Sequence, residues 1–307
     1  MIYDLIIIGG SSAATPAAIY AARRNLKFKL ITKDFGGELA TSGEIGNWPG
    51  IVSTSGIALA QQFREHLGAL KVEIDEGVEV EKIAKQADGG FLVSAKEPAG
   101  TSYQAKTVIV ATGAHPKELN IPGEKEYRTK GVSYCTVCDG PIFAGKTCAT
   151  IGGGNSALES ALMLADICSK VYVINKNAQF KGEQVLIDNL KAKKNVEIIF
   201  NAKTTDIFGD EFATGLRYSD VTRDMLHELR ADGIFVHIGM IPNSSIVSDD
   251  VAKDQFGYIK VNANCETSVP GLFAAGDVTD VPFKQNPIAA GQGTIALLSA
   301  VGYLNRL

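Results

Sequence analysis

The chain has 307 residues, of which 45% are hydrophobic, and it carries a net charge of −4 with an isoelectric point of about 5.7. This length exceeds one typical domain and predicts two, and the apolar content suffices for a sizeable core without disulfide staples. The acidic balance and the scatter of the charges along the chain argue against nucleic acid or a membrane surface as a partner.

The first apolar run, residues 5–8, ends at the pair Gly9-Gly10. It is too short to span a bilayer, and Asp4 stands where a signal peptide would carry basic residues. We therefore interpret the run as a buried parallel strand and expect a cytoplasmic protein. Five cysteines that include a closely spaced pair also fit a reducing compartment.

The first segments follow the order strand, turn, helix, strand. Residues 5–8 lead through the glycine turn into an alanine-rich helix that reaches about residue 23, and a second apolar run covers residues 28–31. The same order recurs with a strand at 149–151, a triple-glycine turn at 152–154, a helix at 156–167 and a strand at 171–174. This is the βαβ unit that binds dinucleotides, so its two copies predict two dinucleotide-binding domains.

Short segments of alternating polarity follow each βαβ unit, and we interpret each group as a β-meander. They lie at residues 78–83, 91–95 and 107–110 after the first unit, and at 196–200, 213–218 and 233–238 after the second. The tail at residues 271–277 returns to nucleotide-site character. We therefore predict an α/β fold of two Rossmann-like domains, each with a β-meander, in which residues 116–241 are inserted into a discontinuous domain made of residues 1–115 and 242–307.

A CxxC motif at residues 135–138 is followed directly by Asp139 and lies shortly before the second glycine turn. Cysteines at this spacing can cycle between dithiol and disulfide, and a lowered thiolate pKa makes one of them a nucleophile. Asp139 is placed to exchange a proton with the departing thiol. A structural zinc site would need four ligands, whereas Cys148, Cys168 and Cys265 lie apart and the four histidines show no ligand spacing. The motif therefore predicts a redox pair and no metal site.

These motifs resemble those of the low-molecular-weight thioredoxin reductases over essentially the whole chain, and several stretches are similar to the flavoprotein subunit of alkyl hydroperoxide reductase. The first likeness is carried by residues 36–39, 47–50, 111–113, 135–140 and 275–277, and the second by residues 152–156, 264–267 and 281–285. The second family has an extra N-terminal thioredoxin-like module, and this chain begins at the flavin domain. We therefore expect its disulfide carrier to be a separate protein.

The resemblance implies FAD in the discontinuous domain. The residues that it assigns to FAD are Gly9, Gly10, Ser11, Ala14, Gly37, Glu38, Leu39, Asn47, Thr112, Gly113, Gly276, Asp277, Lys284, Gln285 and Asn286. Ser11 and Ala14 stand where the dinucleotide fingerprint has glycines. Both side chains are small, so we expect FAD binding to be retained.

The resemblance places a nicotinamide nucleotide in the inserted domain, at Gly152, Gly154, Asn155, Ser156, Asn175, Lys176 and Lys181. NADPH-using thioredoxin reductases carry His-Arg-Arg-x-x-Phe-Arg where this chain has Asn-Lys-Asn-Ala-Gln-Phe-Lys at residues 175–181. Lysines bind a 2′-phosphate less specifically than arginine forks, and Asn175 can accept from a ribose hydroxyl without repelling a phosphate. We expect NADPH, with NADH as the alternative; the intact glycine turn disfavours a third donor, reduced ferredoxin.

The resemblance also implies a reaction path from nicotinamide through FAD to the Cys135–Cys138 disulfide. Cys138 would face the flavin, Cys135 would attack the disulfide of thioredoxin or a thioredoxin-like protein, and Asp139 would serve as acid and base. Because the CxxC and the nicotinamide site share one domain, we expect that domain to rotate about hinges near residues 115–116 and 241–242. The family further implies a homodimer.

Two other functions stay open. One is an NADH- or ferredoxin-driven reductase of a peroxiredoxin-supporting carrier, which the stretches similar to alkyl hydroperoxide reductase suggest. The other is a non-catalytic flavoprotein redox sensor, against which Cys135, Cys138 and Asp139 argue. The partner that oxidises the reduced enzyme faster would discriminate between the two reductases.

Overall fold

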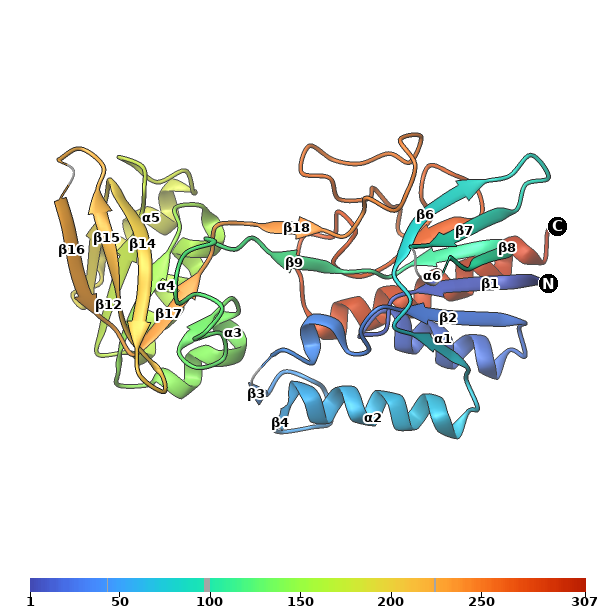
Figure 1. Ribbon diagram of the computed structural model, residues 1–307, viewed down its shortest axis with the longest axis horizontal. Coiled ribbons are helices and arrows are strands. Elements are labelled where there is room, and N and C mark those ends of the chain that lie inside the picture. The colour runs from blue at the N-terminus through green and yellow to red at the C-terminus, as the bar shows by residue number, and fades with distance from the viewer. Residues whose placement is uncertain (43, 97–99, 224) are drawn as a thin grey trace. The chain divides into compact units, whose positions relative to one another are not determined.

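The computed structural model describes residues 1–42, 44–96, 100–223 and 225–307, which divide into two compact units (Figure 1). Unit 1 comprises Met1–Thr41, Ile45–His115 and Ile241–Leu307, and unit 2 comprises Ser42–Glu44 and Pro116–Met240. Relative to the predicted boundaries, residues 42–44 and residue 241 fall in the other unit. The second boundary cuts through β18 (Met240–Pro242), which pairs with β9 (Ala114–Pro116), so both connections are extended strands.

Unit 1 is built on a sheet with the order β5-β2-β1-β8-β7-β6, to which β19 adds by pairing with β8. Its elements are β1 (Ile2–Ile8), α1 (Ala14–Arg23), β2 (Phe28–Thr32), η1 (Gly37–Leu39), β3 (Glu44–Ile45), β4 (Thr54–Ser55), α2 (Gly56–Ala69), β5 (Ile74–Glu76), β6 (Val80–Lys85), β7 (Phe91–Ala95), β8 (Ser102–Val110), β19 (Leu272–Ala274) and α6 (Asn286–Leu304). The β1, β2, β5, β8 and β19 strands run parallel, whereas β6 and β7 form the antiparallel meander.

The second half of β1, residues 5–8, is apolar and buried because both faces of the sheet are covered there. Leu5 and Ile7 point into a core shared with the alanines of α1 and with α6, whereas Ile6 and Ile8 point into the core on the opposite face. Figure 1 shows α1 and α6 side by side on their face of the sheet. By length and composition α6 could cross a membrane, but its small residues pack here against α1, as in the core helix of a folded domain.

Unit 2 has a parallel sheet in the order β10-β17-β11-β12-β13 and a separate antiparallel sheet in the order β14-β15-β16. Its elements are β10 (Val132–Ser133), α3 (Thr136–Asp139), η2 (Gly140–Phe143), β11 (Thr147–Ile151), α4 (Asn155–Ile167), β12 (Lys170–Ile174), α5 (Gln184–Ala192), β13 (Val196–Ile199), β14 (Ala202–Gly209), β15 (Ala213–Asp220), β16 (Met225–Arg230) and β17 (Gly233–Val236). One core lies between the parallel sheet and the meander, and another lies between that sheet and its helices.

The second meander differs from the sequence interpretation. Residues 196–200 and 233–238 were expected in it, but the strands there, β13 and β17, pair parallel within the dinucleotide sheet. The strands β14 and β16 flank β15 instead. The alternation of polar and apolar residues did not indicate β14 and β16. The strand β14 carries a register irregularity between Thr204 and Asp206, and most of β16 is exposed.

Candidate functional site

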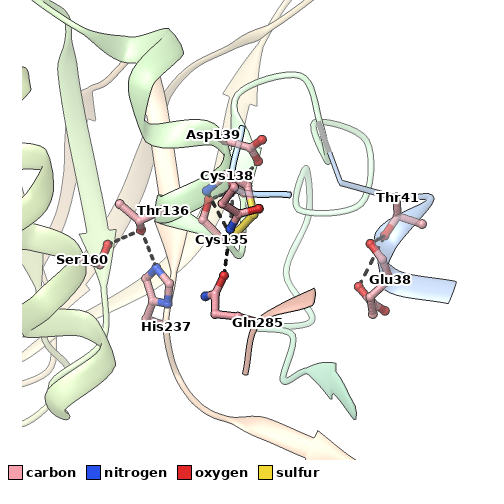
Figure 2. The surroundings of a disulfide bond; sticks show 11 residues. Glu38, Thr41, Cys135, Thr136, Cys138, Asp139, Ser160, His237 and Gln285 are labelled. Carbon is pink, nitrogen blue, oxygen red and sulfur yellow. Dashed lines mark hydrogen bonds between the residues drawn. A yellow bond between two sulfur atoms is a disulfide. The ribbon is translucent and has the colours of Figure 1, made fainter. Parts of the chain in front are cut away.

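The redox motif forms a disulfide between Cys135 and Cys138 at the start of α3. Cys135 is the N-cap of this single helical turn, and its Sγ accepts a hydrogen bond from the main-chain N–H of Cys138 at 3.3 Å. The Ser133 hydroxyl donates to Asp139 Oδ2 at 2.6 Å and accepts from the main-chain N–H of Cys135 at 3.1 Å. Ser133 therefore fixes the Asp139 carboxylate to the turn that carries the disulfide. Figure 2 shows Asp139 beside Cys135 and Cys138.

A hydroxyl–imidazole network on the inner side of α3 was missed by the sequence reasoning. Thr136 Oγ1 lies 2.6 Å from Ser160 Oγ on α4 and 2.9 Å from His237 Nε2 (Figure 2). Burial lowers the pKa of His237 to about 4, so its ring is neutral at neutral pH. The sequence held no signal for this network, because its members come from three separate segments.

The glycine turn of unit 2 joins β11 to α4. Gly152 has φ +149°, and a Cβ there would lie 2.2 Å from the main-chain oxygen of His237, so this position requires glycine. Gly154 is the N-cap of α4 without a side-chain cap, and open space surrounds the position of its missing Cβ. Main-chain N–H groups beside open space at a helix N-terminus fit the pyrophosphate of a dinucleotide.

The loop after β12 holds the three residues predicted to set nucleotide preference. Asn175 is 2% exposed, its Nδ2 donates to the Gln179 carbonyl at 3.0 Å, and its Oδ1 accepts from the Asn177 N–H at 3.2 Å. The Asn175 side-chain amide thus stabilises the conformation of its own loop. Lys176 and Lys181 are exposed, and the N–H of Lys181 donates to the Gly153 carbonyl, which ties the loop to the glycine turn.

The Glu183 carboxylate, which was also missed by the sequence reasoning, lies beside the glycine turn of unit 2. Asn155, the first residue of α4, donates through Nδ2 to Glu183 Oε1 at 2.9 Å and accepts through Oδ1 from the Glu183 N–H at 2.8 Å. Glu183 is the N-cap of α5, so this pair fixes the start of α5 to the start of α4. Ser156 beside it is exposed.

The residues predicted for FAD all lie in unit 1. They come from the turn between β1 and α1 (Gly9, Gly10, Ser11, Ala14), η1 (Gly37, Glu38, Leu39), the loop with Asn47, the turn after β8 (Thr112, Gly113), and the segment from β19 into α6 (Gly276, Asp277, Lys284, Gln285, Asn286). The Ser12 hydroxyl donates to Asn286 Oδ1 at 2.8 Å, and Asn47 Nδ2 donates to Gln285 Oε1 at 2.9 Å. These two hydrogen bonds therefore join the N-terminal segments of unit 1 to the start of α6.

The glycine turn of unit 1 fits a dinucleotide despite its serine. Gly9 has φ +130°, and a Cβ there would lie 2.1 Å from the main-chain oxygen of Ala111. Ala14 is fully buried in the helix–sheet core, which is the close-packing task of the third fingerprint position. The Thr15 hydroxyl in the first turn of α1 is buried without a hydrogen-bond partner among the described residues, as is Asn47 Oδ1. Such orphaned polar atoms fit a bound polar cofactor.

Charged side chains border the same place. Burial raises the pKa of Asp277, with Lys284 acting in the opposite sense and Glu38 adding to the rise. Lys284 Nζ donates to the Thr279 carbonyl at 2.6 Å and lies 4.2 Å from the centre of the Tyr258 ring. Burial in turn lowers the pKa of Lys284. Both groups are therefore partly desolvated, which disfavours the charged form of each.

The turn after β8 is hydrogen-bonded to the segment that contains Asn243. The Thr112 hydroxyl donates to the Asn243 carbonyl at 2.7 Å, and Asn243 Nδ2 donates to the Thr112 carbonyl at 2.8 Å. Gly113 has φ +70°, with open space at its Cβ position. Thr112 thus binds its neighbouring segment through its side chain, and Gly113 leaves room for a ligand.

Among the described residues no group of three or more His, Cys, Asp or Glu side chains is placed to hold a metal ion. The Sγ atoms of Cys148 and Cys168 lie 3.5 Å apart inside unit 2, and Cys265 is buried in unit 1.

Two dinucleotide units and a CxxC disulfide are the arrangement expected of a pyridine nucleotide-disulphide oxidoreductase. The chain belongs to the pyridine nucleotide-disulphide oxidoreductase family, whose model matches residues 3–293. Members of this family bind FAD and NAD(P)H, and so does this protein.

Known proteins of two kinds resemble the chain. Thioredoxin reductase from Streptococcus pyogenes superposes with a TM-score of 0.91 at 34% identity and covers 100% of this chain and 99% of its own. Thioredoxin reductase from Giardia duodenalis gives a TM-score of 0.90 at 30% identity, with 99% of each chain covered. An alkyl hydroperoxide reductase subunit from Escherichia coli is 42% identical over 99% of this chain. The chain spans 58% of the length of that relative.

Proposed function

We propose that this protein reduces the disulfide of thioredoxin or a thioredoxin-like protein, with NAD(P)H as electron donor and Cys135–Cys138 as the last carrier. The observation that carries this proposal is a disulfide in the same unit as a pyrophosphate-compatible glycine turn, with a second such turn in the other unit. When bound, FAD would supply the two-electron link between nucleotide and disulfide. The full-length similarity to thioredoxin reductases supports this class of partner.

The thiol chemistry needs only residues of α3 and its neighbours. After reduction, the Cys135 thiolate attacks one sulfur of the partner disulfide, which forms a mixed disulfide and releases the other partner sulfur as a thiolate. Cys138 then attacks the Cys135 sulfur, which restores the Cys135–Cys138 disulfide and frees the partner as a dithiol. Asp139, held by Ser133, takes the proton from one thiol and returns it to the departing thiolate.

The nucleotide preference belongs to the loop at residues 175–181. We propose NADPH, because Lys176 and Lys181 are exposed and the loop is tied to the glycine turn through the N–H of Lys181. NADH is the alternative, since an ammonium group grips a phosphate less specifically than a guanidinium. The ratio of kcat/KM for NADPH and NADH in wild type and in Lys176→Ala tests this assignment, with a fall confined to NADPH expected.

A second candidate partner is a thioredoxin-like carrier that supports a peroxiredoxin. The 42% identity to the alkyl hydroperoxide reductase subunit of Escherichia coli favours it, and the thiol chemistry would be the same. We propose a cytoplasmic location on the short first apolar run and the cysteine content, and a homodimer on the family resemblance.

Steady-state turnover tests both the chemistry and the partner. Wild type and Cys138→Ser would be assayed with NADPH or NADH against thioredoxin and against an isolated thioredoxin-like carrier module. Cys138→Ser should lose turnover with either partner while its flavin is still reduced by nucleotide. Cys265→Ser, a buried cysteine in the other unit, is the matched control and should turn over normally. Undiminished turnover of Cys138→Ser would refute the proposed path.

A further inference from the structure

The two residues between the redox cysteines face opposite environments. Thr136 is 5% exposed, whereas Val137 is 49% exposed. A threonine buried in such a short helical turn must find partners for its hydroxyl inside the unit. One side of α3 is therefore anchored to the interior of unit 2, and the other side is exposed.

The anchor of Thr136 consists of side chains from other elements of unit 2. Its Oγ1 lies 2.6 Å from Ser160 Oγ on α4 and 2.9 Å from His237 Nε2, in the segment after β17 (Figure 2). Ser160 Oγ lies 3.4 Å from Thr150 Oγ1 on β11. Thr150 and Ser160 are both buried, so water does not compete for these hydroxyls.

His237 is itself held firmly. Its N–H donates to the Ile151 carbonyl at 2.8 Å, and its main-chain oxygen packs so closely on the turn that a Cβ at Gly152 would lie 2.2 Å away. Because burial keeps the ring neutral, Nε2 can accept the Thr136 hydroxyl proton while the Ser160 hydroxyl donates to Thr136. In this arrangement Ser160 donates to Thr136 and Thr136 donates to His237, so each of the three side chains has a hydrogen-bond partner.

We propose that His237 is a positioning residue that acts through Thr136 to set the dithiol–disulfide equilibrium of Cys135 and Cys138. In the disulfide state the covalent bond holds the turn. In the dithiol state that bond is gone, and the network keeps the two sulfurs close enough to recombine. Preorganisation of this kind raises the effective concentration of one thiol at the other, which favours the disulfide.

Removal of the network should therefore shift the equilibrium toward the dithiol. Two hydrogen bonds to Thr136 are lost when its hydroxyl is removed, and each neutral hydrogen bond changes an equilibrium several-fold. We expect a shift of about tenfold, which is about 30 mV for this two-electron couple, toward a more oxidising disulfide.

The test uses matched variants of the holoenzyme. Thr136→Val removes the hydroxyl at nearly constant volume, and Thr136→Ser retains it. His237→Leu removes the nitrogen acceptor, and His237→Gln retains a polar atom near the position of Nε2. Each protein would be equilibrated in dithiothreitol buffers of graded redox poise, and alkylation followed by mass spectrometry would measure the dithiol fraction at residues 135 and 138.

The expected result is a shift of about tenfold for Thr136→Val and His237→Leu, with Thr136→Ser and His237→Gln within about twofold of wild type. Unchanged equilibria in Thr136→Val and His237→Leu, with lowered thermal stability, would overturn the proposal and leave the network merely structural. If either apolar variant fails to fold, Ser160→Ala gives the same comparison with less disturbance, and an equilibrium equal to that of wild type there would also overturn it.

The proposal rests on the redox role of Cys135–Cys138, but not on the donor or the partner. The equilibrium with dithiothreitol requires neither nucleotide nor thioredoxin. A failure to turn over both thioredoxin and the thioredoxin-like carrier module would therefore refute the proposed function and leave the positioning role of His237 standing.

Discussion

Substitution of Gly152 by alanine should damage both the fold of unit 2 and its nucleotide site. An added Cβ would lie 2.2 Å from the His237 main-chain oxygen and 2.7 Å from Ala157 Cβ, at φ +149°. The backbone conformation costs a non-glycine residue about 1–3 kcal/mol, and the overpacking adds about 1–3 kcal/mol because a main-chain atom must move. The sum of about 4 kcal/mol is a large share of a typical stability of about 5–15 kcal/mol.

Gly154 in the same turn provides the matched control. Its φ is −97°, and open space surrounds the position of its missing Cβ, so Gly154→Ala should leave the stability within about 1 kcal/mol of wild type. The added methyl group would instead stand in the space that fits the pyrophosphate. We expect a rise of about tenfold or more in the nucleotide KM for Gly154→Ala, with its melting temperature preserved.

Thermal unfolding followed by circular dichroism, together with nucleotide titration of flavin reduction, measures both effects. Gly152→Ala should melt about 10 °C or more below wild type. A melting temperature for Gly152→Ala within about 2 °C of wild type would refute the steric reasoning. An unchanged nucleotide KM in Gly154→Ala would show that the pyrophosphate does not occupy the space beside this glycine.

Three further predictions concern unit 2. Asp139→Asn should slow dithiol–disulfide exchange by about tenfold or more while flavin content and flavin reduction by nucleotide stay normal in stopped-flow assays; an unchanged exchange rate would make Asp139 structural. Glu124 is fully buried and accepts from the N–H groups of Leu119 and Asn120 and from the Tyr134 hydroxyl, so Glu124→Gln should lower the unfolding free energy by about 2–3 kcal/mol in urea titrations, and a loss below about 0.5 kcal/mol would contradict this. The pKa of His237 is lowered from 6.5 to about 4, so the unfolded state binds the extra proton. The neutral His237 ring contributes fully to the unfolding free energy above about pH 6.5, and up to about 3 kcal/mol of that free energy is lost as the pH falls toward 4. His237→Gln should remove this part of the acid sensitivity in chemical unfolding between about pH 7 and pH 4. An unaltered pH profile of the unfolding free energy would contradict the assignment.

The local patterns in the sequence predicted the two dinucleotide units. Glycine positions such as Gly9 and Gly152 follow from backbone geometry at a strand–helix turn, which is a local property. The CxxC spacing likewise predicts the disulfide, because its two sulfurs lie within one helical turn. The meander of unit 2 was less accessible, since polarity alternation does not tell β13 and β17, which pair within the parallel sheet, from strands of an antiparallel one.

The side-chain contacts that the sequence did not predict are those whose partners are distant in the chain. Thr136 bonds to Ser160 and His237, which are 24 and 101 residues away, and Asn47 bonds to Gln285 at a separation of 238. Side-chain hydrogen bonds of this kind depend on tertiary packing, which no single segment encodes.

Anaerobic mixing with NADPH or NADH decides whether nicotinamide electrons reach Cys135 and Cys138 through the flavin. Stopped-flow absorbance would follow flavin bleaching, and alkylation with mass spectrometry would then count new thiols. We expect rapid bleaching by at least one nucleotide and labelling of both Cys135 and Cys138. A flavin that dithionite reduces but neither nucleotide bleaches, or bleaching without new thiols at these two residues, would contradict this path.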